Sequence, residues 1–433
     1  MTLRAPDRID RLAPLPDRLP AVDLRALLPA GFRAGATRAG IKASGALDLG
    51  VLATTGAPAT AAGTFTTNRV QAAPVRLSRT NLAASEGRAA AVIATSGCAN
   101  AATGGAGERD QRLLAESLAA SLGVAPELTL ALSTGLIGSR LPVERIQAAL
   151  GELVPDGLST DDAALARLAE QLRTTDSRPK AASVRISLPG PDGGAKEVTV
   201  SGVAKGVGMI HPRMATMLAL VLTDAAVEPS VLREVLAPVV EQTWNQLTVD
   251  GDTSTNDTVF LLASGGSGAA PLENGTAALE AFTRAVEAVA RSLARQQAAD
   301  GEGATTLLTC QVSGAKDGAQ ARAVAREVVG SSLVKAATHG HDPNWGRIAA
   351  AAGNATVAGA PVPLDPDRLA IAIAGVPVFE GEPLAFDRAA LSRAMAGSEV
   401  LVRVDLGLGE GIGEAFGCDL TEQYVVENSA YST

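Results

Sequence analysis

The chain contains 433 residues, enough for two or three domains or for one large interleaved unit. Its 37 Lys and Arg against 46 Asp and Glu give a formal charge of −9 without any basic run, so neither nucleic acid nor an anionic membrane surface is an expected partner. Only 2 Trp, 2 Tyr and 7 Phe occur, too few for base-stacking platforms. Three widely spaced cysteines without a CxxC pair predict neither a disulfide framework nor a cysteine zinc site.

The segment 1–25 carries charges and prolines where a signal peptide needs an apolar stretch, and we expect it to form an irregular or loosely docked arm. The longest apolar runs, such as 217–222, have the length of a strand and are far shorter than a membrane span. We therefore expect a soluble protein of the cytoplasm without membrane partners.

Short apolar segments alternate with helical patterns and predict an α+β fold. In chain order, the predicted strands are 91–94, 129–133, 184–188, 198–203, 217–222, 259–263, 369–374 and 400–405. The predicted helices are 108–122, a valine repeat at 231–239, and 279–296. Between them, 189–196 is expected to be a hairpin turn, 265–270 a loop, and the Gly/Ala/Pro-rich tract 353–363 a boundary before a final α+β segment.

The common catalytic motifs are missing: there is no HExxH helix, no Walker loop and no G-x-S-x-G elbow. The acidic run 250–257 lacks the glycine and glutamate of an EF-hand loop, which favours a buried polar turn over a metal site. His339 and His341 flank a glycine beside Asp342 but have no convincing third ligand, so a structural turn is favoured there too. We expect no metal.

The segment 205–218 carries the strongest chemical signal. A glycine-rich approach leads into Met-Ala-Thr, and Thr216 opens an apolar strand. If the chain cleaves itself between Ala215 and Thr216, the freed α-amine becomes the base for the Thr216 hydroxyl. Such an amine has a pKa of about 7.7–8.0, so no histidine is required, and a nearby Lys205 would favour its neutral form. The alternative is that Thr216 is an ordinary first residue of a strand.

Residues 202–225 closely resemble the self-processing segment of the ornithine acetyltransferase (glutamate N-acetyltransferase, ArgJ) family. The resemblance spans nearly the whole chain, through motifs that follow in the same order: 40–42, 65–68, 73–75, 96–100, 133–138, 174–180, 248–257, 302–305, 342–347 and 418–433. It implies an α+β fold, a layered α/β/β/α-type sandwich of the self-processing ArgJ/DmpA-like class with a smaller C-terminal lobe. It also implies an alpha chain 1–215 and a beta chain 216–433, assembled as two copies of each.

The resemblance further implies a ping-pong acetyl transfer that serves arginine biosynthesis. Thr216 attacks the acetyl carbonyl of N2-acetylornithine, ornithine leaves, and the α-amine of glutamate takes the acetyl group to give N-acetylglutamate. No cofactor is expected to stay bound, although some family members also accept acetyl-CoA as a co-substrate.

By the same resemblance, Thr134 and Gly135 form the oxyanion hole, where the loss of one donor typically costs about 100- to 1000-fold in rate. The implied substrate-contacting positions are Thr174, Lys205, Thr216, Glu302, Asn428 and Thr433. From charge, we expect Glu302 to pair with the ornithine side-chain ammonium and Lys205 with the substrate carboxylate. The carboxyl-terminal end is then docked rather than frayed.

Four positions depart from the family pattern: Thr95, Cys98 and Arg213 stand where Asn is usual, and Thr306 stands where Lys is usual. They leave open a related acyltransferase of a specialised pathway. An N-terminal-nucleophile amidohydrolase or aminopeptidase is a second alternative, and an unprocessed relative without enzymatic activity is a third.

Overall fold

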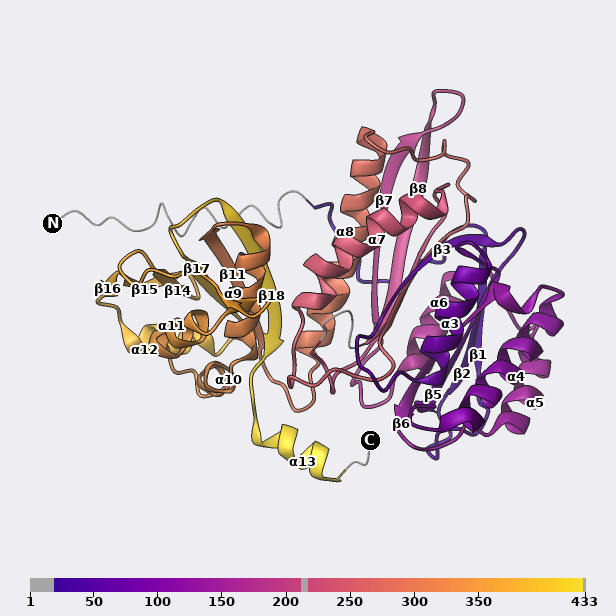
Figure 1. Cartoon of the computed structure of the whole chain (residues 1–433), viewed down its shortest axis with the longest axis horizontal. Coiled ribbons are helices and arrows are strands. Elements are labelled where there is room, and N and C mark those ends of the chain that lie inside the picture. The colour runs from indigo at the N-terminus through magenta and orange to yellow at the C-terminus, as the bar shows by residue number, and fades with distance from the viewer. Residues whose placement is uncertain (1–18, 212–216, 431–433) are drawn as a thin grey trace.

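The computed structural model describes residues 19–211 and 217–430 (Figure 1). Within these residues, two sheets face each other in the larger part of the molecule, and a third sheet forms a separate lobe near the carboxyl terminus. Of the predicted irregular arm, residues 19–25 are described, and Asp23 forms an isolated antiparallel bridge with Ser183. No helix of the described residues is both long enough and apolar enough to cross a membrane.

The first sheet has four strands in the order β1–β2–β5–β6. They are β1 (Phe32–Thr37), β2 (Leu49–Thr54), β5 (Ala91–Cys98) and β6 (Thr129–Leu136). Its single parallel pair, β5 and β6, is joined by the crossover helix α4 (Gly104–Leu122), as parallel strands require. Leu49 and Ile93 of this sheet pack on Leu114 of α4 and on Leu150 of α5 (Val143–Leu153), so both helices cover its outer face.

The second sheet has six strands in the order β4–β3–β10–β9–β8–β7. They are β3 (Ala59–Phe65), β4 (Arg88–Ala89), β7 (Lys180–Pro189), β8 (Ala195–Lys205), β9 (Leu218–Thr223) and β10 (Thr258–Ala263). The parallel pair β9 and β10 is again joined by a helix, α7 (Pro229–Gln242). The predicted turn at 189–196 joins β7 and β8 as an antiparallel hairpin, which confirms that prediction.

The central strand β9 is buried on both faces, and its residues alternate between two cores. Leu218, Leu220 and Leu222 face the first sheet, where helices α3 (Ala73–Ala84) and α6 (Asp162–Leu172) complete the core between the sheets. Ala219 and Val221 face the opposite side, which α7 and α8 (Ala277–Ala299) cover. Helices thus form both outer layers and also fill the space between the two sheets, and the expected α+β sandwich is confirmed.

The C-terminal lobe has its own six-stranded sheet, in the order β16–β15–β14–β17–β11–β18, and its own apolar core. Its strands are β11 (Leu307–Ala315), β14 (Ala370–Ile373), β15 (Val376–Glu380), β16 (Glu382–Pro383), β17 (Glu399–Asp405) and β18 (Gly411–Cys418). Its helices are α9 (Gly318–Gly330), α10 (Ser332–His339), α11 (Trp345–Gly353) and α12 (Arg388–Met395). The last helix, α13 (Glu422–Ala430), follows β18 and extends away from the lobe (Figure 1).

The predicted boundary at 353–363 is wrong. The lobe already includes β11, which pairs with both β17 and β18 and so lies in the middle of the third sheet. The Gly/Ala/Pro-rich tract instead forms a small hairpin of β12 (Thr356–Val357) and β13 (Ala360–Pro361). Ala358 and Gly359 both have positive φ, 51° and 82°, as the tight turn of a two-residue hairpin requires.

Candidate active site

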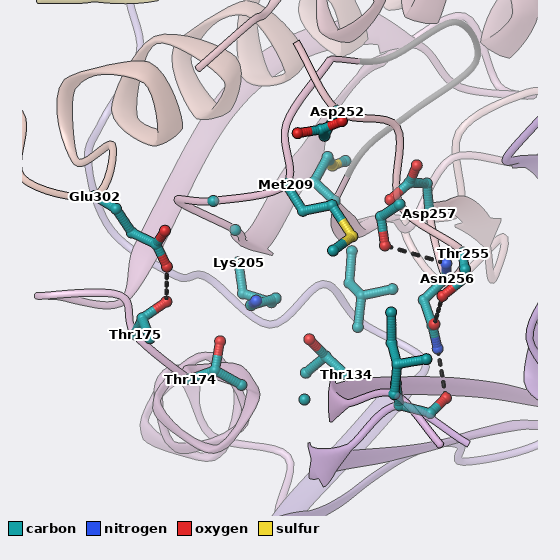
Figure 2. A pocket seen from close by; sticks show the side chains of 18 of the residues that line it. Thr134, Thr174, Thr175, Lys205, Met209, Asp252, Thr255, Asn256, Asp257 and Glu302 are labelled. Atoms are coloured by element: carbon teal, nitrogen blue, oxygen red, sulfur yellow. Dashed lines mark hydrogen bonds between the residues drawn. The ribbon is translucent and has the colours of Figure 1, made fainter. Parts of the chain in front are cut away.

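A polar cavity of about 240 Å³ brings together residues from segments far apart in the sequence (Figure 2). The described positions that the sequence predicted all line it, namely Thr134, Gly135, Thr174, Lys205, Glu302 and Asn428. The other predicted positions, Ala215, Thr216 and Thr433, lie outside the described residues. Met217, which directly follows Thr216 in the chain, is part of the cavity wall.

The end of β6 forms one side of the cavity with Thr134 and Gly135. Gly135 has φ +125°, and a Cβ there would lie 2.3 Å from the carbonyl carbon of Gly97, so only glycine fits. The carbonyl of Ser133, the residue before Thr134, accepts a hydrogen bond from Asn256 Nδ2 at 2.8 Å. The strand end is thus fixed, and Thr134 is held at the wall, where a preorganised donor can stabilise developing negative charge.

Lys205 ends β8 and carries an amine into the cavity although the residue is only 8% exposed. Its Nζ lies 3.8 Å from Asp176 Oδ2. Burial lowers the pKa of Lys205, and Lys180 lowers it further, whereas Asp176 and Glu302 act in the opposite direction. The site therefore contains a poorly hydrated amine whose charge depends on its neighbours.

Glu302 lies in the loop between α8 and β11, and two neutral donors hold its carboxylate. Thr175 Oγ1 donates to Oε1 at 2.8 Å, and Asn428 Nδ2 donates to Oε2 at 2.9 Å. The Glu302 carboxylate can lie here because residue 208 is a glycine. A Cβ on residue 208 would lie 2.2 Å from Glu302 Oε2. Since both donors are uncharged, the negative charge of Glu302 is left available for a ligand cation.

Helix α13 closes part of the cavity. Its first turn is anchored by Thr421, whose hydroxyl donates to the carbonyl of Gly303 at 2.7 Å. Asn428 and Tyr424 of this helix line the cavity, and burial together with Asp250 raises the pKa of Tyr424 to about 12. The carboxyl-terminal segment is docked at the cavity as far as Asn428.

The turn 250–257 contributes the residues that sequence reasoning did not assign to the site. Six of its members line the cavity: Asp250, Asp252, Ser254, Thr255, Asn256 and Asp257. Asp250 accepts hydrogen bonds from the backbone N–H groups of Met209 (2.6 Å) and Ile210 (2.8 Å) and so fixes the segment that approaches position 211. The prediction of a buried polar turn is confirmed for Thr255, Asn256 and Asp257, whereas Gly251 and Asp252 are exposed. Its richness in hydroxyl and amide groups was a signal that could also have placed it at the site.

The remaining polar features lie outside the cavity wall. His339 Nδ1 contacts Asp419 Oδ2 at 3.2 Å, in line with a structural turn. Cys98 donates to the carbonyl of Ser139 at 3.2 Å, and the Thr306 N–H donates to Asp419 at 3.0 Å, whereas Arg213 lies outside the described residues. Within the described ranges, no group of three or more His, Cys, Asp or Glu residues is arranged to hold a metal ion.

Two facing sheets, helices and a cavity at the strand ends define an α+β sandwich protein with a candidate active site. The sequence model of the ArgJ family matches residues 33–433. The arginine biosynthesis bifunctional protein ArgJ of Thermus thermophilus is 49% identical over 94% of this chain and 99% of its own length. The protein of the same name from Gloeobacter violaceus is 45% identical over 93% of this chain and 96% of its own. The crystal structure of arginine biosynthesis bifunctional protein argJ from Bacillus halodurans, 38% identical, covers 50% of this chain and 100% of that chain with a TM-score of 0.48.

The chain therefore belongs to the ArgJ family. The resemblance carried by its motifs is confirmed, and with it the expectation of an enzyme.

Proposed function

We propose that this chain is a glutamate N-acetyltransferase of arginine biosynthesis, which moves the acetyl group of N2-acetylornithine to glutamate through an acetyl ester on Thr216. The observation that carries the proposal is convergence: every described position that the family resemblance implied lies on one cavity, together with Met217. These positions come from distant parts of the sequence, so their meeting is a property of the fold.

The charges of the cavity suit the proposed donor. N2-acetylornithine carries one carboxylate and one side-chain ammonium, and the cavity offers the Lys205 amine and the Glu302 carboxylate. Thr134 and Gly135 line the side of the cavity where the acetyl oxygen would gain negative charge during the reaction. The two ends of the donor and its reacting carbonyl thus each have a matching group.

The proposed reaction exchanges one acyl bond for another in two steps. The Thr216 oxygen forms an ester bond to the acetyl carbon, the amide C–N bond breaks, and the hydroxyl proton passes by way of the Thr216 α-amine to the leaving amine of ornithine. In the second step the α-amine of glutamate forms an amide bond to the acetyl carbon and the ester C–O bond breaks. A proton of the attacking amine passes to the Thr216 oxygen.

Self-cleavage between Ala215 and Thr216 is part of the proposal, and the second sheet supports it. β9 begins at Leu218 and lies between β8, from the first part of the chain, and β10, from the second. The hydrogen bonds of the sheet would hold the chains 1–215 and 216–433 together after cleavage. Cleavage would therefore free the α-amine of Thr216 without separating the two parts.

Intact mass under denaturing conditions, before and after exposure to N2-acetylornithine, tests the proposal. We expect two chains divided at Ala215/Thr216, with the chain 216–433 heavier by one acetyl group after exposure. Thr216→Ala should stay as one chain, whereas Thr223→Ala, at the other end of β9, should still be cleaved. A native chain that stays whole and unmodified would refute the proposal, and cleavage without acetylation would refute the donor.

By the same family membership, we propose acetyl-CoA as a second acetyl donor and an assembly of two copies of each chain. Exposure to acetyl-CoA in the mass measurement should label the chain 216–433 in the same way. Sedimentation should give the mass of two cleaved proteins. An unlabelled chain or a sedimenting monomer would refute the corresponding proposal.

A further inference from the structure

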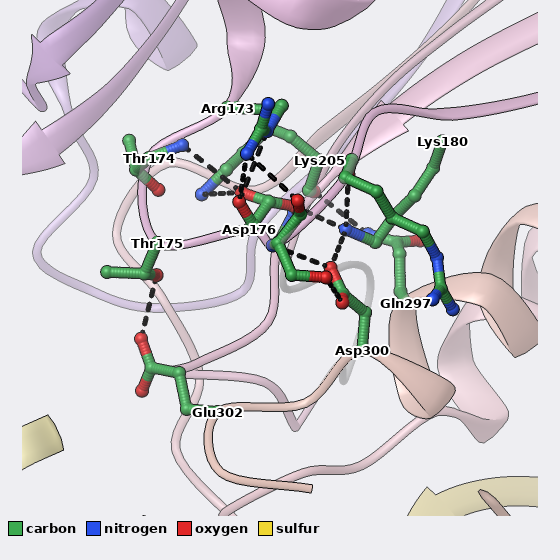
Figure 3. Close-up of polar contacts among 12 residues, drawn as sticks. Arg173, Thr174, Thr175, Asp176, Lys180, Lys205, Gln297, Asp300 and Glu302 are labelled. Carbon is green, nitrogen blue, oxygen red and sulfur yellow. Dashed lines mark hydrogen bonds and ion pairs between the residues drawn. The ribbon is translucent and has the colours of Figure 1, made fainter. Parts of the chain in front are cut away.

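Behind the cavity wall lies a buried cluster of two carboxylates and two amines, Asp176, Asp300, Lys180 and Lys205, which we call the charge quartet (Figure 3). Each of these side chains is at most 10% exposed. Lys205 lines the cavity, and the other three lie behind it. Four charged groups withdrawn from water at this depth require mutual neutralisation.

The distances divide the quartet into a tight part and a loose part. Lys180 Nζ lies 2.7 Å from Asp176 Oδ1 and 2.7 Å from Asp300 Oδ2, within hydrogen-bond reach of both. Lys205 Nζ lies 3.8 Å from Asp176 Oδ2, which is an ionic contact too long for a hydrogen bond. Asp176 therefore neutralises Lys205 without occupying the N–H donors that a ligand in the cavity needs.

The Asp176 carboxylate also fixes the backbone at two cavity residues, Thr174 and Gly206. Asp176 Oδ1 accepts from the Gly206 N–H at 2.8 Å, and Oδ2 accepts from the Thr174 N–H at 3.2 Å. Thr174 and Lys205 are thus tied to one side chain that does not itself line the cavity. A shift of Asp176 would move both.

The charge of Lys205 depends on a small number of groups. Burial and Lys180 lower its pKa, and the nearest group that raises it is Asp176. Glu302 and Asp257 also raise the pKa of Lys205. Two further cations lie in this region: Lys42, whose pKa Lys205 lowers, and Arg173, which donates to the Asp176 carbonyl at 2.8 Å. Burial raises the pKa of Asp176, but Lys205, Lys180 and the Gly206 N–H together lower it to about 2, so this carboxylate stays charged at any ordinary pH.

We propose that Asp176 is the positioning residue that keeps Lys205 protonated and directed into the cavity, and that Lys180 and Asp300 form a self-neutralising pair that holds Asp176 in place. The assignment of a substrate carboxylate as the ligand of Lys205 rests on the proposed function. The charge and placement of Lys205 do not. Asp176 acts through Lys205 and the backbone and touches no reacting atom.

Two matched substitutions separate this role from simple structural support. Asp176→Asn and Asp300→Asn each remove one carboxylate from Lys180, but only Asp176 faces Lys205. We would measure the rate of reductive methylation of Lys205 by formaldehyde as a function of pH, with peptide mass spectrometry and without substrate. Asp176→Asn should lower the midpoint by about one pH unit or more, and Asp300→Asn should leave it nearly unchanged. Equal shifts in both variants, or none in either, would overturn the proposal.

A third variant keeps the test decisive even where Asp176→Asn does not fold. The double change Lys180→Met with Asp300→Asn removes one positive and one negative charge. Of the quartet, only Asp176 and Lys205 then remain charged. The midpoint for Lys205 should then move to higher pH, because a repelling cation has gone. An unchanged or lower midpoint contradicts the proposed arrangement.

Kinetics add a second readout. In Asp176→Asn the KM for N2-acetylornithine should rise about tenfold or more, and the alkaline limb of kcat/KM should move to lower pH, whereas Asp300→Asn should show neither change. A native chain that transfers no acetyl group but shows the expected methylation shifts would refute the proposed function alone. Active native protein with methylation insensitive to Asp176 would refute this inference alone.

Discussion

Two glycines illustrate how single residues shape the candidate site. Gly135 lets the end of β6 approach Gly97, and Gly208 lets the Glu302 carboxylate lie against the backbone. Neither role can be derived from composition, because a glycine in a sequence does not reveal what approaches it. The family resemblance implied a role for Gly135 in the site, and the structure supplies a physical reason why this residue is a glycine.

Gly135→Ala should reduce both activity and stability. The new methyl group would lie 2.3 Å from the Gly97 carbonyl carbon at a φ of +125°, so the turn must move. We expect kcat/KM to fall about 100-fold and the free energy of unfolding by about 3 kcal/mol. Gly138→Ala is the control, because its φ is also positive but nothing lies within 4 Å, and it should cost only about 1 kcal/mol. Similar losses in both variants, measured by steady-state kinetics and urea unfolding, would contradict the steric argument.

Glu302→Gln should weaken selection for a cationic donor. The substitution keeps the size of the side chain and removes the charge that Thr175 and Asn428 leave unneutralised. The ratio of kcat/KM for N2-acetylornithine over N-acetylnorvaline, which lacks the ammonium, should fall about tenfold or more. The control is Glu427→Gln, also on α13 but outside this cavity, where the carboxylate accepts a hydrogen bond from Gln423; it should leave the ratio unchanged. A ratio unaffected by Glu302→Gln would remove this residue from ammonium recognition.

Asp176 also gives a prediction for acid stability. Its pKa of about 2 in the folded chain lies below the value of about 3.9 for an unfolded one, so its contribution is present above about pH 4 and is lost as the pH falls toward 2. Asp176→Asn should lower the free energy of unfolding at neutral pH by about 3–5 kcal/mol, since two buried lysines lose a counter-charge. The difference from the native chain should shrink between about pH 4 and pH 2.

Asp224→Asn gives the control of opposite sign for that measurement. Burial raises the pKa of Asp224, so protonation of this group stabilises the folded chain as the pH falls. Urea unfolding at a series of pH values checks both variants. A difference between Asp176→Asn and the native chain that stays constant below pH 4 would contradict the linkage.

Among the elements, the eight strands that the sequence predicted all contain leucine, isoleucine or valine, but the similarly apolar strands β2 (LGVLAT) and β11 (LLTCQVSGA) were not predicted. All eight predicted strands and all three predicted helices correspond to observed elements. The strands β1 and β3 were not predicted, because their sequences, FRAGAT and ATAAGTF, consist mainly of small residues that carry little hydrophobic periodicity. Their burial comes from close packing between layers, which is a tertiary property.

The residues of the candidate site also divide into those that the sequence predicted and those that only the fold reveals. Thr134, Lys205, Glu302 and Asn428 were assigned to the site through the family motifs. The turn 250–257 was recognised as a family motif and as a polar turn, without a role in the site. The roles of Asp176 and Asp300 depend on contacts between the loop that follows α6, the start of β7, the end of β8 and the end of α8, which no local pattern encodes. Burial and pairing distance decide what a charged residue does, and both require the fold.

Helix α13 should be needed for binding rather than for folding. None of its residues belongs to an apolar core cluster of the described chain. It meets the site through the side chain of Tyr424 and through the hydrogen bond from Asn428 to Glu302. Asn428→Ala should raise the KM for the donor about tenfold and change the melting temperature little. Val425→Ser, at a position 63% exposed on the same helix, is the control and should change neither. A large drop in melting temperature for Asn428→Ala would mean that α13 supports the fold.

The whole molecule combines the two proposed chains in one sheet. β9 and β10 lie in the middle of the second sheet, with β8 on one side and β3 on the other. After the proposed cleavage, the chains 1–215 and 216–433 should remain one particle in native mass spectrometry and unfold in a single transition. Dissociation of the two chains without denaturant would contradict this interleaving.

The position of β9 also has a consequence for the biogenesis of the protein. Made alone, residues 216–433 would carry β9 and β10 as a two-stranded, leucine-rich ribbon with both edges bare, since the neighbouring strands β8 and β3 belong to the other part. Such edges pair readily with those of other molecules, so the isolated half should aggregate in the cell. Because a single polypeptide supplies β8 and β3 as neighbours while β9 and β10 fold, the two halves made from separate genes should yield less soluble protein than the continuous chain.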